Sequence, residues 1–322
     1  MSSELNPLDA AFIPVPACWI CGGRHFKPYH RLVFELSAFR DQHPGLHAYS
    51  GKSLWLRRCR TCGFAQPEAM PSLPNYYDLL YDQLWGEAWM HTEFDSGYKD
   101  LIFNTILKDL ESRVTAEPRS ILDIGAHVGR FIHLAAGRGW KAEGIELNPR
   151  TCAFAVQRTG LTVHRLNAHQ LAAKGHSYDA VTLIDVLEHI PEPVAIMANA
   201  FGLLKPGGWF AIKVPHGRTQ WIKEIIHEKF SRNYRATLAD NLVHVNHFSG
   251  GSLRRALLSV GFDKVHLAVG APECPPLSPA DGVLKRVTLA GRKATYDLMA
   301  ALPGEISVPF GLHLQAYARK PK

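Results

Sequence analysis

The sequence has no long hydrophobic run and no basic amino terminus. No part of its 322 residues is an uninterrupted apolar stretch of the ~18 residues that a membrane helix requires. The first 20 residues contain two acidic side chains, Glu4 and Asp9, and no lysine or arginine, whereas a secretory signal begins with a basic segment. We therefore expect a cytoplasmic protein with no membrane insertion. Charged residues at 20% and hydrophobic residues at 46% exclude a disordered or collagen-like chain.

Cysteine is also scarce, with six residues, and a reducing cytosol excludes a disulfide scaffold. Four of the six form two C-x-x-C-Gly pairs, Cys18 with Cys21 and Cys59 with Cys62. Glycine after the second cysteine permits the tight backbone that lets two thiolates of one turn reach one ion. The spacing predicts a structural Zn²⁺ site that folds a small module, against the alternatives of a redox disulfide or independent core cysteines. Cys152 and Cys274 stand alone, and we interpret them as small buried or loop residues.

The net charge of +7 is unevenly distributed along the chain. Residues 18–70 carry 8 basic and 3 acidic side chains, whereas residues 71–150 carry 8 basic and 12 acidic ones. Residues 216–235 add +3 and residues 283–322 add +5. Clustered basic charge favours an acidic or phosphorylated partner, either a small molecule or a nucleic acid.

From about residue 119 strands alternate with amphipathic helices, which predicts an α/β fold with a parallel sheet covered on both faces. The expected strands are 120–125, 142–147, 162–166, 178–186, 209–215, 263–269 and 312–318. The expected helices are 128–139, 149–159, 194–204 and one that begins at Ser249 or Ser252 and ends at Val260.

The loop after the first of these strands has the composition of a nucleotide-binding turn. It reads Asp123-Ile-Gly125-Ala126-His127-Val-Gly129, with glycines where the backbone must approach a ligand closely. Glu146 follows about 20 residues on, at the end of the second strand, where a carboxylate accepts hydrogen bonds from both ribose hydroxyls. A chance acidic residue is the alternative for Glu146.

Further blocks follow this loop in a recognisable order. They are Asn167-Ala168, the segment Tyr178 to Ile190 containing Asp185, Glu188 and His189, and Leu204-Lys-Pro-Gly-Gly208. Over about 200 residues the chain resembles the class I S-adenosylmethionine-dependent methyltransferases, which have a Rossmann-like seven-stranded sheet. One position departs from the pattern, because that family usually has glycine where this chain has His127.

The resemblance implies a role for each matching residue. Gly125 and Gly129 would lie against the methionine part of S-adenosyl-L-methionine, Glu146 on the ribose, Asn167 with Ala168 near adenine, and Asp185 beside the site of methyl transfer. It also places Asp123, Ala126 and Leu147 among the cofactor-binding residues.

The amino-terminal part resembles zinc-containing methyltransferases that modify nucleotide sugars and other glycans, on the two C-x-x-C-Gly pairs and the connector Pro74-Asn-Tyr-Tyr-Asp-Leu-Leu-Tyr81. We accordingly expect a zinc-ribbon-like module at 1–70, a helical connector at 71–117 and the methyltransferase domain at 118–322. Aromatic residues recur in the connector at a spacing of four, which predicts that they form one face of a helix packed on the core. The alternative is that these aromatic side chains cap the cofactor pocket. These aromatics are Tyr77, Tyr81, Trp85 and Trp89, with Tyr76 beside them.

The general base must come from segments that cover the cofactor, and two insertions are long enough, 216–248 and 271–306. We predict His247 or His244 as that base, because histidine titrates near neutral pH, ahead of His216 and Tyr234. Trp221 and His227 lie in the same insertion. Ubiquinone-pathway methyltransferases bind a divalent metal in a block similar to Asp185-x-x-Glu188-His189, which is an alternative use of these residues.

Three functions remain open from the sequence. The first is methylation of a hydroxyl on a sugar, nucleotide sugar or other small metabolite. The second is methylation of RNA gripped by the basic zinc module. The third is a cofactor-free interaction module, which only the His127 departure favours.

Overall fold

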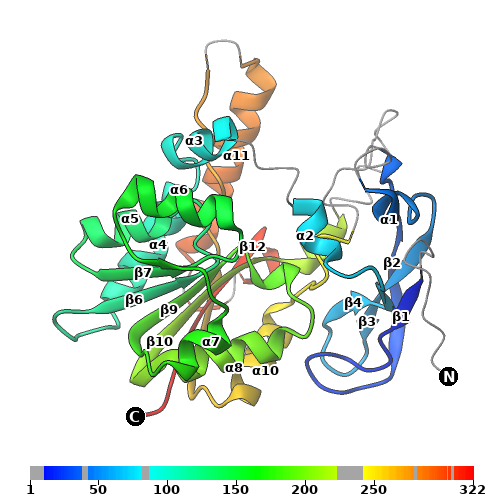
Figure 1. Ribbon diagram of the computed structural model, residues 1–322, viewed down its shortest axis with the longest axis horizontal. Helices are drawn as coiled ribbons and strands as arrows, with labels where there is room; N and C mark the ends of the chain where they lie inside the picture. The colour runs from blue at the N-terminus through cyan, green and yellow to red at the C-terminus, as the bar shows by residue number, and fades with distance from the viewer. Residues whose placement is uncertain are drawn as a thin grey trace.

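The computed structural model describes residues 11–37, 43–81, 87–222, 242–278, 281–302, 304–305 and 308–322. The chain forms a small amino-terminal β-module beside a large α/β domain, and the connector runs between them (Figure 1). Among the described residues, no helix is long and apolar enough to cross a membrane.

The amino-terminal module is built from two small antiparallel sheets. One has the order β2-β3-β4, and the other pairs β1 with β5. The strands are β1 Phe12–Pro14, β2 Phe26–Val33, β3 Ser53–Cys59, β4 Ala65–Pro67 and β5 Ala69–Pro71, with the short helix α1 Pro44–His47 between β2 and β3. Each C-x-x-C-Gly pair lies at a turn: Cys18 and Cys21 come before β2, and Cys59 ends β3 with Cys62 in the turn that leads to β4.

The connector is helical, but it does not form the single aromatic helix face that the spacing predicts. The described part contains α2 Tyr76–Tyr81, α3 Glu87–Asp95 and α4 Asp100–Glu111. Tyr76 is buried in the core of the amino-terminal module, whereas Trp89 is on the separate helix α3. Trp85 lies outside the described residues. The connector aromatics therefore lie in two different places, the core of the amino-terminal module and helix α3.

The large domain has a seven-stranded sheet in the order β11-β12-β10-β9-β6-β7-β8. Its strands are β6 Ser120–Ile124, β7 Lys141–Ile145, β8 Val163–His164, β9 Tyr178–Ile184, β10 Leu204–Pro215, β11 Lys264–Val269 and β12 His313–Arg319. The expectation of a parallel sheet is wrong for one strand, because β12 runs antiparallel to both β10 and β11. Helix α11 Val283–Ala300 lies between β11 and β12 in the chain, but none of its residues is buried, so it does not cover the sheet as the crossover helix of a parallel pair does.

Helices cover both faces of this sheet (Figure 1). On one face α4, α5 and α6 bury Ile121, Ala180 and Ala211, and on the other α7, α8 and α10 bury Leu122, Val181 and Phe210. This alternation of adjacent residues is the period of two that a strand covered on both faces requires. The remaining bounds are α5 Arg130–Gly137, α6 Pro149–Thr159, α7 Ala168–Ala173, η2 Leu187–His189, α8 Pro193–Leu203, α10 Gly250–Val260 and η4 Val308–Phe310.

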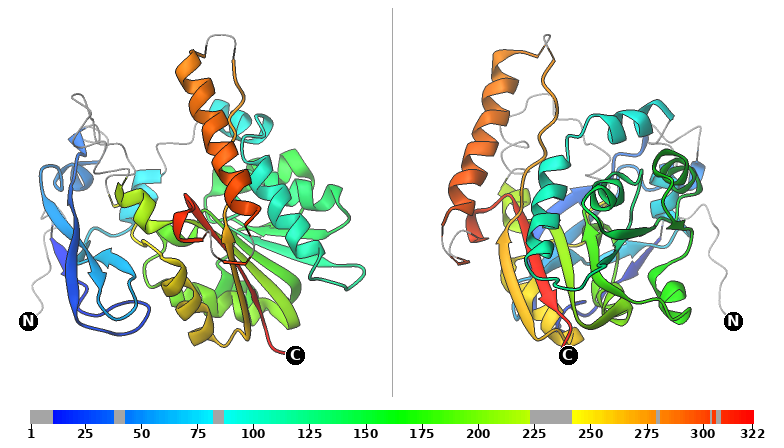
Figure 2. Two further views of the ribbon diagram at one scale, coloured as in Figure 1. Left: turned by 180° about the vertical axis from the view of Figure 1, so that it is seen from behind. Right: turned by 90° about the vertical axis from the view of Figure 1, so that its left-hand side faces the viewer.

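The second insertion contains a long helix, where the sequence suggested an irregular segment. Helix α11 Val283–Ala300 is 18 residues long and stands away from the domain (Figure 2). Its carboxyl-terminal half contacts the domain, where Tyr296 packs against the buried core beneath α4 and α5.

Candidate functional site

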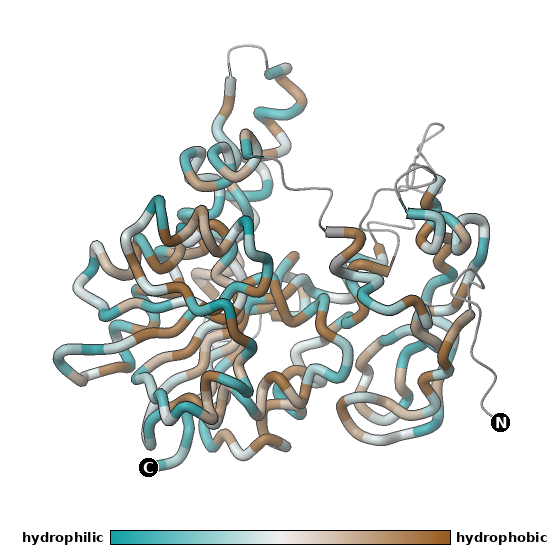
Figure 3. Tube along the Cα trace, viewed as in Figure 1, coloured by the Kyte–Doolittle hydropathy of each residue, from teal (hydrophilic) through white to brown (hydrophobic). Residues whose placement is uncertain are grey.

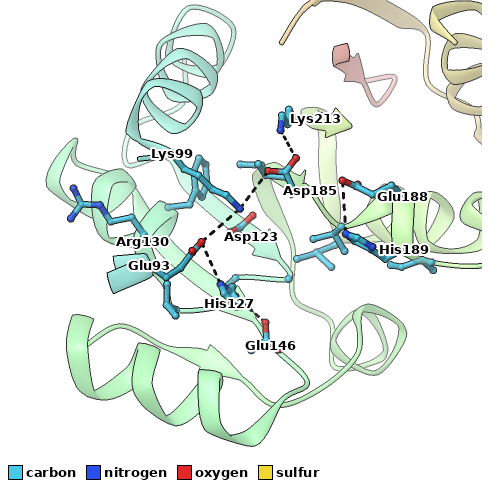
Figure 4. Close-up of a pocket in the computed structure, with 18 of the residues that line it drawn as sticks. Glu93, Lys99, Asp123, His127, Arg130, Glu146, Asp185, Glu188, His189 and Lys213 are labelled. Atoms are coloured by element: carbon cyan, nitrogen blue, oxygen red, sulfur yellow. Dashed lines mark hydrogen bonds and ion pairs between the residues drawn. The ribbon is translucent and has the colours of Figure 1, made fainter. Parts of the chain in front are cut away.

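A cavity of about 1430 Å³ opens above the carboxyl ends of β6, β7, β9 and β10. In open α/β sheets this edge is where ligands bind. Its wall combines the loop between β6 and α5 with residues of the connector and of the segments that follow β9 and β10 (Figure 4). Of the cofactor residues expected from the sequence, all but Gly129 line this cavity.

The loop after β6 has the left-handed backbone that its glycines predict. Gly125 has φ +81°, and a Cβ on it would lie 2.5 Å from Val186 Cγ2. His127 also has a positive φ, +53°, and its N–H donates to Glu146 Oε2 at 2.9 Å. Histidine here therefore adopts the backbone conformation that glycine adopts freely, at a cost of ~1–2 kcal/mol. Although this chain has histidine where the family usually has glycine, the loop still forms its hydrogen bond to Glu146.

Gly129 has a different place from the one that the resemblance implies. It has φ +81° and precedes helix α5, and a Cβ on it would lie 3.0 Å from the Cβ of Ala155 in α6. It is not among the residues that line the cavity. Gly129 therefore allows α5 and α6 to pack closely.

The Glu146 carboxylate is held by main-chain amides at the end of β7. Oε2 accepts from His127 N at 2.9 Å, and Oε1 accepts from Asn148 N at 2.8 Å. Burial raises the pKa of Glu146, and these backbone hydrogen bonds act in the opposite direction. Each carboxylate oxygen has two lone pairs, so both oxygens keep one for the hydroxyls of a ribose. Glu146 thus fits the ribose role.

Leu147, Asn167 and Ala168, which the sequence predicts to lie near adenine, all line the cavity. Asn167 caps helix α7, where its side chain accepts from Gln170 N at 2.9 Å. The side chain of Leu147 is 62% exposed, which leaves an apolar surface beside Glu146 for a planar base.

Asp185 lines the cavity and lies between two lysines (Figure 4). Its carboxylate pairs with Lys213 Nζ and lies 3.6 Å from Lys99 Nζ. Burial acts to raise the pKa of Asp185, but the two ammonium groups hold it well below its usual range. Asp185 also has φ +56°, a left-handed conformation that its surroundings stabilise. It is therefore a fixed anion at pH 7.

Tyr77 and Trp89, the connector aromatics with cofactor capping as their alternative role, line the cavity, and so do the polar connector residues Glu93, Tyr98 and Lys99, which the sequence reasoning missed. Glu93 Oε2 accepts from Tyr98 Oη at 2.6 Å, and Glu93 Oε1 lies 3.7 Å from Lys99 Nζ. His127 Nδ1 is 4.0 Å from the same Glu93 oxygen. No motif marks these residues, because only the packing of α3 and α4 over the loop after β6 brings them to the site. Lys213 was missed for a similar reason, since the run of β10 from Trp209 to Pro215 is apolar apart from this residue.

His244 is on the cavity wall, as the sequence reasoning requires of a base. Its Nδ1 is 2.8 Å from Gln220 Nε2, and its ring centroid is 4.8 Å from that of His189. Burial, with His189 and His247 nearby, lowers the pKa of His244 well below its usual value. His244 is therefore neutral at pH 7 and has a defined hydrogen-bond partner.

His247, the other expected base, is not among the residues that line the cavity. It packs against the amino-terminal module, where its backbone pairs with Ala65 at 3.0 and 3.1 Å and its ring centroid is 6.1 Å from that of Tyr29. Burial lowers the pKa of His247 to about 4. The fold carries only one of the two histidines to the cavity because the chain crosses from the cavity wall to the module between them. His227 and Tyr234 lie outside the described residues, and His216 is buried beside Thr219.

The segment that contains these histidines joins the two parts of the molecule. Phe248 of this segment packs on Phe64, with ring centroids 4.9 Å apart. Phe64 belongs to the amino-terminal module and follows Cys62 by two residues. Val245 N and Asn246 N both donate to the Glu188 carbonyl, at 2.9 and 3.0 Å. The amino-terminal module therefore supports the wall that carries His244.

Two metal sites follow from the sequence, and the four paired cysteines fit the ion expected of the first. The four paired cysteines bring their sulfurs within 4.8 Å of one another, with 3.6 Å between Cys18 and Cys62 and between Cys21 and Cys59. Tetrahedral zinc with Zn–S bonds of about 2.3 Å requires separations of about 3.8 Å. The glycines after each pair, Gly22 and Gly63, have φ +68° and +76°, which is the tight turn expected. This set fits Zn²⁺.

A cation at Asp185 does not fit, because Lys213 and Lys99 already neutralise that carboxylate. Glu188, His189 and His244 do bring potential ligand atoms within 4.8 Å of one another. Glu188 is buried beside Asp185, and burial with that negative neighbour raises its pKa to about 8. Because metal ligands are deprotonated, an ion bound by these three residues would displace the proton of Glu188.

Comparison with known proteins decides the family. A family described as a methyltransferase domain matches residues 98–267, more than half of the chain. The chain belongs to this family. The α/β methyltransferase fold expected from the sequence is thereby confirmed, and its sheet is the mixed seven-stranded one described above.

Among curated relatives, the methyltransferase domain is similar to proteins named ubiquinone biosynthesis O-methyltransferase. The one from Hydrogenovibrio crunogenus is 30% identical over 147 residues, 44% of this chain and 59% of the relative. The one from Paraburkholderia phytofirmans is 35% identical over 109 residues, 32% of this chain and 47% of the relative. The chain thus spans about half the length of these relatives.

Solved structures also resemble the domain. A SAM-dependent methyltransferase from Archaeoglobus fulgidus has a TM-score of 0.47 and 16% identity over 72% of this chain and 99% of that chain. The plantazolicin methyltransferase BpumL in complex with SAH has a TM-score of 0.49 and 12% identity over 78% of this chain and 92% of that chain.

Proposed function

We propose that the protein transfers the methyl group of S-adenosyl-L-methionine to a hydroxyl of a small molecule. The observation that carries this proposal is one cavity with two chemically different ends. Glu146 and the loop after β6 form the end suited to a nucleoside, and Asp185, Lys213 and His244 form the other. The O-methyltransferase names of the curated relatives support transfer to oxygen.

On the cofactor side the chain supplies orientation and charge. The sulfonium of S-adenosyl-L-methionine supplies an electrophilic methyl group for in-line displacement. The Glu146 carboxylate would bind the ribose, and Leu147 and Ala168 would contact the adenine. Asp185 lies where the aminoacyl end of such a ligand would come, and together with Lys213 and Lys99 it would present fixed charges of both signs to the ammonium and carboxylate groups of that end.

On the acceptor side His244 is the group we propose to remove the hydroxyl proton. A neutral histidine accepts a proton at Nε2 only if Nδ1 carries the hydrogen. The Gln220 amide must then present its oxygen to His244 Nδ1, and amide orientation is set by the hydrogen-bond network. Gln220 would thus fix the tautomer of the base.

For the acceptor we propose a sugar, nucleotide sugar or related metabolite, supported by the resemblance of the cysteine module to that of glycan-modifying methyltransferases. Incubation with methyl-labelled S-adenosylmethionine and a panel of sugar nucleotides and hydroxylated metabolites, read by mass spectrometry, tests this. A product 14 Da heavier than one acceptor supports the proposal. Label found only in added RNA contradicts it.

RNA methylation is the alternative function, and the amino-terminal module gives it little support. Arg57 donates to Val15 O at 2.7 Å and lies 4.5 Å above the Phe26 ring, and Arg58 donates to Gly63 O at 3.2 Å. These guanidinium groups hold the module together. Filter binding to RNA that weakens steeply with salt would favour this alternative.

A further inference from the structure

A further group of possible metal ligands lies at the β8 edge of the large sheet, outside the cavity. Its members are Glu143 on β7, His164 on β8 and His176 in the turn between α7 and β9. One potential ligand atom from each lies within 4.8 Å of the other two. The central strands β9 and β10 are largely hydrophobic (Figure 3), whereas this group is polar. The function proposed above uses none of these residues.

The register of the sheet places Glu143 and His164 on the same face. Side chains alternate along a strand, so Glu143 shares its face of β7 with Ile145, and Ile145 is paired with His164 across β7 and β8. Ile145 belongs to the core that α7 and α8 cover. Gly175, with φ +79°, turns the chain after α7 and leads to His176. The three side chains therefore converge from two strands and one turn.

The Glu143 carboxylate is oriented by two neighbours. Its Oε2 lies 2.8 Å from His164 Nε2 and accepts a hydrogen bond from Tyr178 Oη at 2.8 Å. Burial acts to raise the pKa of Glu143, but the hydrogen bonds from His164 and Tyr178 hold it below its usual value, so the carboxylate is ionised at pH 7. Carboxylates that bind metals are themselves hydrogen-bonded by a second residue. Tyr178 is placed to be that residue.

Two imidazoles and one carboxylate are a common ligand set for a divalent transition metal. Ligand atoms that lie about 2.0–2.1 Å from one ion are about 2.9–3.4 Å from each other in octahedral or tetrahedral geometry. The 2.8 Å between Glu143 Oε2 and His164 Nε2 is close to this range. The rings of His164 and His176 have centroids 5.5 Å apart. None of the three residues is buried, so an ion and water can reach them.

We propose that Glu143, His164 and His176 bind one divalent transition-metal ion such as Zn²⁺, with water completing its coordination. Binding requires His164 to carry its hydrogen on Nδ1, because Nε2 then offers its lone pair to the ion. This site has three protein ligands, whereas the cysteine site has four thiolates. The ion at Glu143 should therefore exchange during dialysis against metal-free buffer, and the cysteine-bound zinc should remain.

An ion here would join the two ends of a segment that forms part of the cavity wall. His164 precedes and His176 follows the segment 165–175, which contains Asn167 of the cavity. The His164 carbonyl also accepts a hydrogen bond from Glu146 N at 3.1 Å. By restricting this segment, the ion should tighten cofactor binding by about 5-fold or more. This consequence rests on the function proposed above, whereas the ion site itself does not.

Calorimetric titration of the dialysed, zinc-containing full chain with Zn²⁺ tests the site. We expect one further ion per chain, bound at least about 10-fold more weakly by His164→Gln and by His176→Gln. His176 lies in a turn, so its variant should keep the unfolding temperature of the metal-free site. His169→Gln is the matched control, because His169 is exposed on α7 outside the group, and it should bind as the unchanged protein does. No further ion, or equal binding by all three variants, overturns the proposal.

His189→Gln separates this site from the group of Glu188, His189 and His244 in the cavity. An ion that His189→Gln loses and His176→Gln retains belongs to the cavity and overturns the proposal.

Titration with S-adenosylhomocysteine, with and without added Zn²⁺, tests the consequence for the cofactor. We expect the affinity of the unchanged protein to rise about 5-fold or more with Zn²⁺, and that of His176→Gln to stay the same. Equal affinity with the ion bound overturns the effect of the ion on the cavity wall. No binding of S-adenosylhomocysteine under either condition contradicts the proposed function, and the Zn²⁺ titration still decides whether the ion site exists.

Discussion

Replacing Gly125 with alanine tests whether the loop after β6 has the conformation on which the site depends. The added Cβ would lie 2.5 Å from Val186 Cγ2, and Gly125 has φ +81°. The left-handed backbone costs a residue with a Cβ ~1–2 kcal/mol, and overpacking of this kind costs ~1–3 kcal/mol, so we expect a loss of about 2–5 kcal/mol. For a domain of this size such a loss lowers the melting temperature by about 4–20 °C.

Thermal unfolding and calorimetric titration with S-adenosylhomocysteine measure the two consequences. The double variant Gly125→Ala/Val186→Ala should recover the overpacking part of the loss, about 1–3 kcal/mol, and retain the backbone part. Gly137→Ala is the control, because nothing lies within 4 Å of a Cβ at that position in α5, and it should leave stability unchanged or slightly higher. A Gly125→Ala protein that unfolds and binds as the unchanged protein does would refute the reasoning.

Three further predictions concern the cysteine site, the base and a buried acid. Elemental analysis should find one zinc ion per chain, and Cys59→Ser should lose the ion and melt at a lower temperature; a chain that folds fully without zinc would contradict this. Because burial lowers the pKa of His244, the acid limb of the kcat/KM profile against pH should lie below pH 6.5. Gln220→Ala should lower kcat more than Gln220→Glu, because a glutamate side chain still accepts a hydrogen bond from His244 Nδ1. Equal losses of kcat in the two variants would reject the role of Gln220 in fixing the tautomer. Burial raises the pKa of Asp123 to about 7, above its unfolded value of about 3.9, so its contribution to stability is present at low pH and is lost as pH rises from about 4 to 7. Denaturant unfolding of Asp123→Asn should lack this part of the pH dependence, and identical profiles would argue against it.

The sequence predicted the regular elements best where local chemistry marks their ends. Helix α6 begins after Asn148, whose side chain accepts from Arg150 N, and ends at Gly160 with φ +68°. Helix α10 begins after Ser249 with a capping box and ends at Gly261. Such caps depend on a few adjacent residues, so they are visible in the sequence. The antiparallel direction of β12 and the long helix α11 depend on distant packing and were missed.

The cofactor half of the site was predicted better than the acceptor half for the same reason. Gly125 and Glu146 belong to one short β-α-β unit, and the strands of that unit fix their separation. His244, Glu93 and Lys213 come from segments far apart in the chain, and only the tertiary fold brings them together. His244 and His247 illustrate this, because they are only three positions apart in the chain. His244 nevertheless lines the cavity, whereas His247 packs against the amino-terminal module.

The central claim is that the cavity above β6 and β7 binds S-adenosylmethionine through Glu146. Isothermal titration of the zinc-loaded protein with S-adenosylhomocysteine tests it most directly, with Glu146→Ala as the comparison. We expect one binding site per chain in the unchanged protein and no measurable binding in Glu146→Ala, because the ribose loses its acceptor and the amides of His127 and Asn148 lose theirs. Equal binding by the two proteins, or no binding by the folded unchanged protein, would contradict the claim.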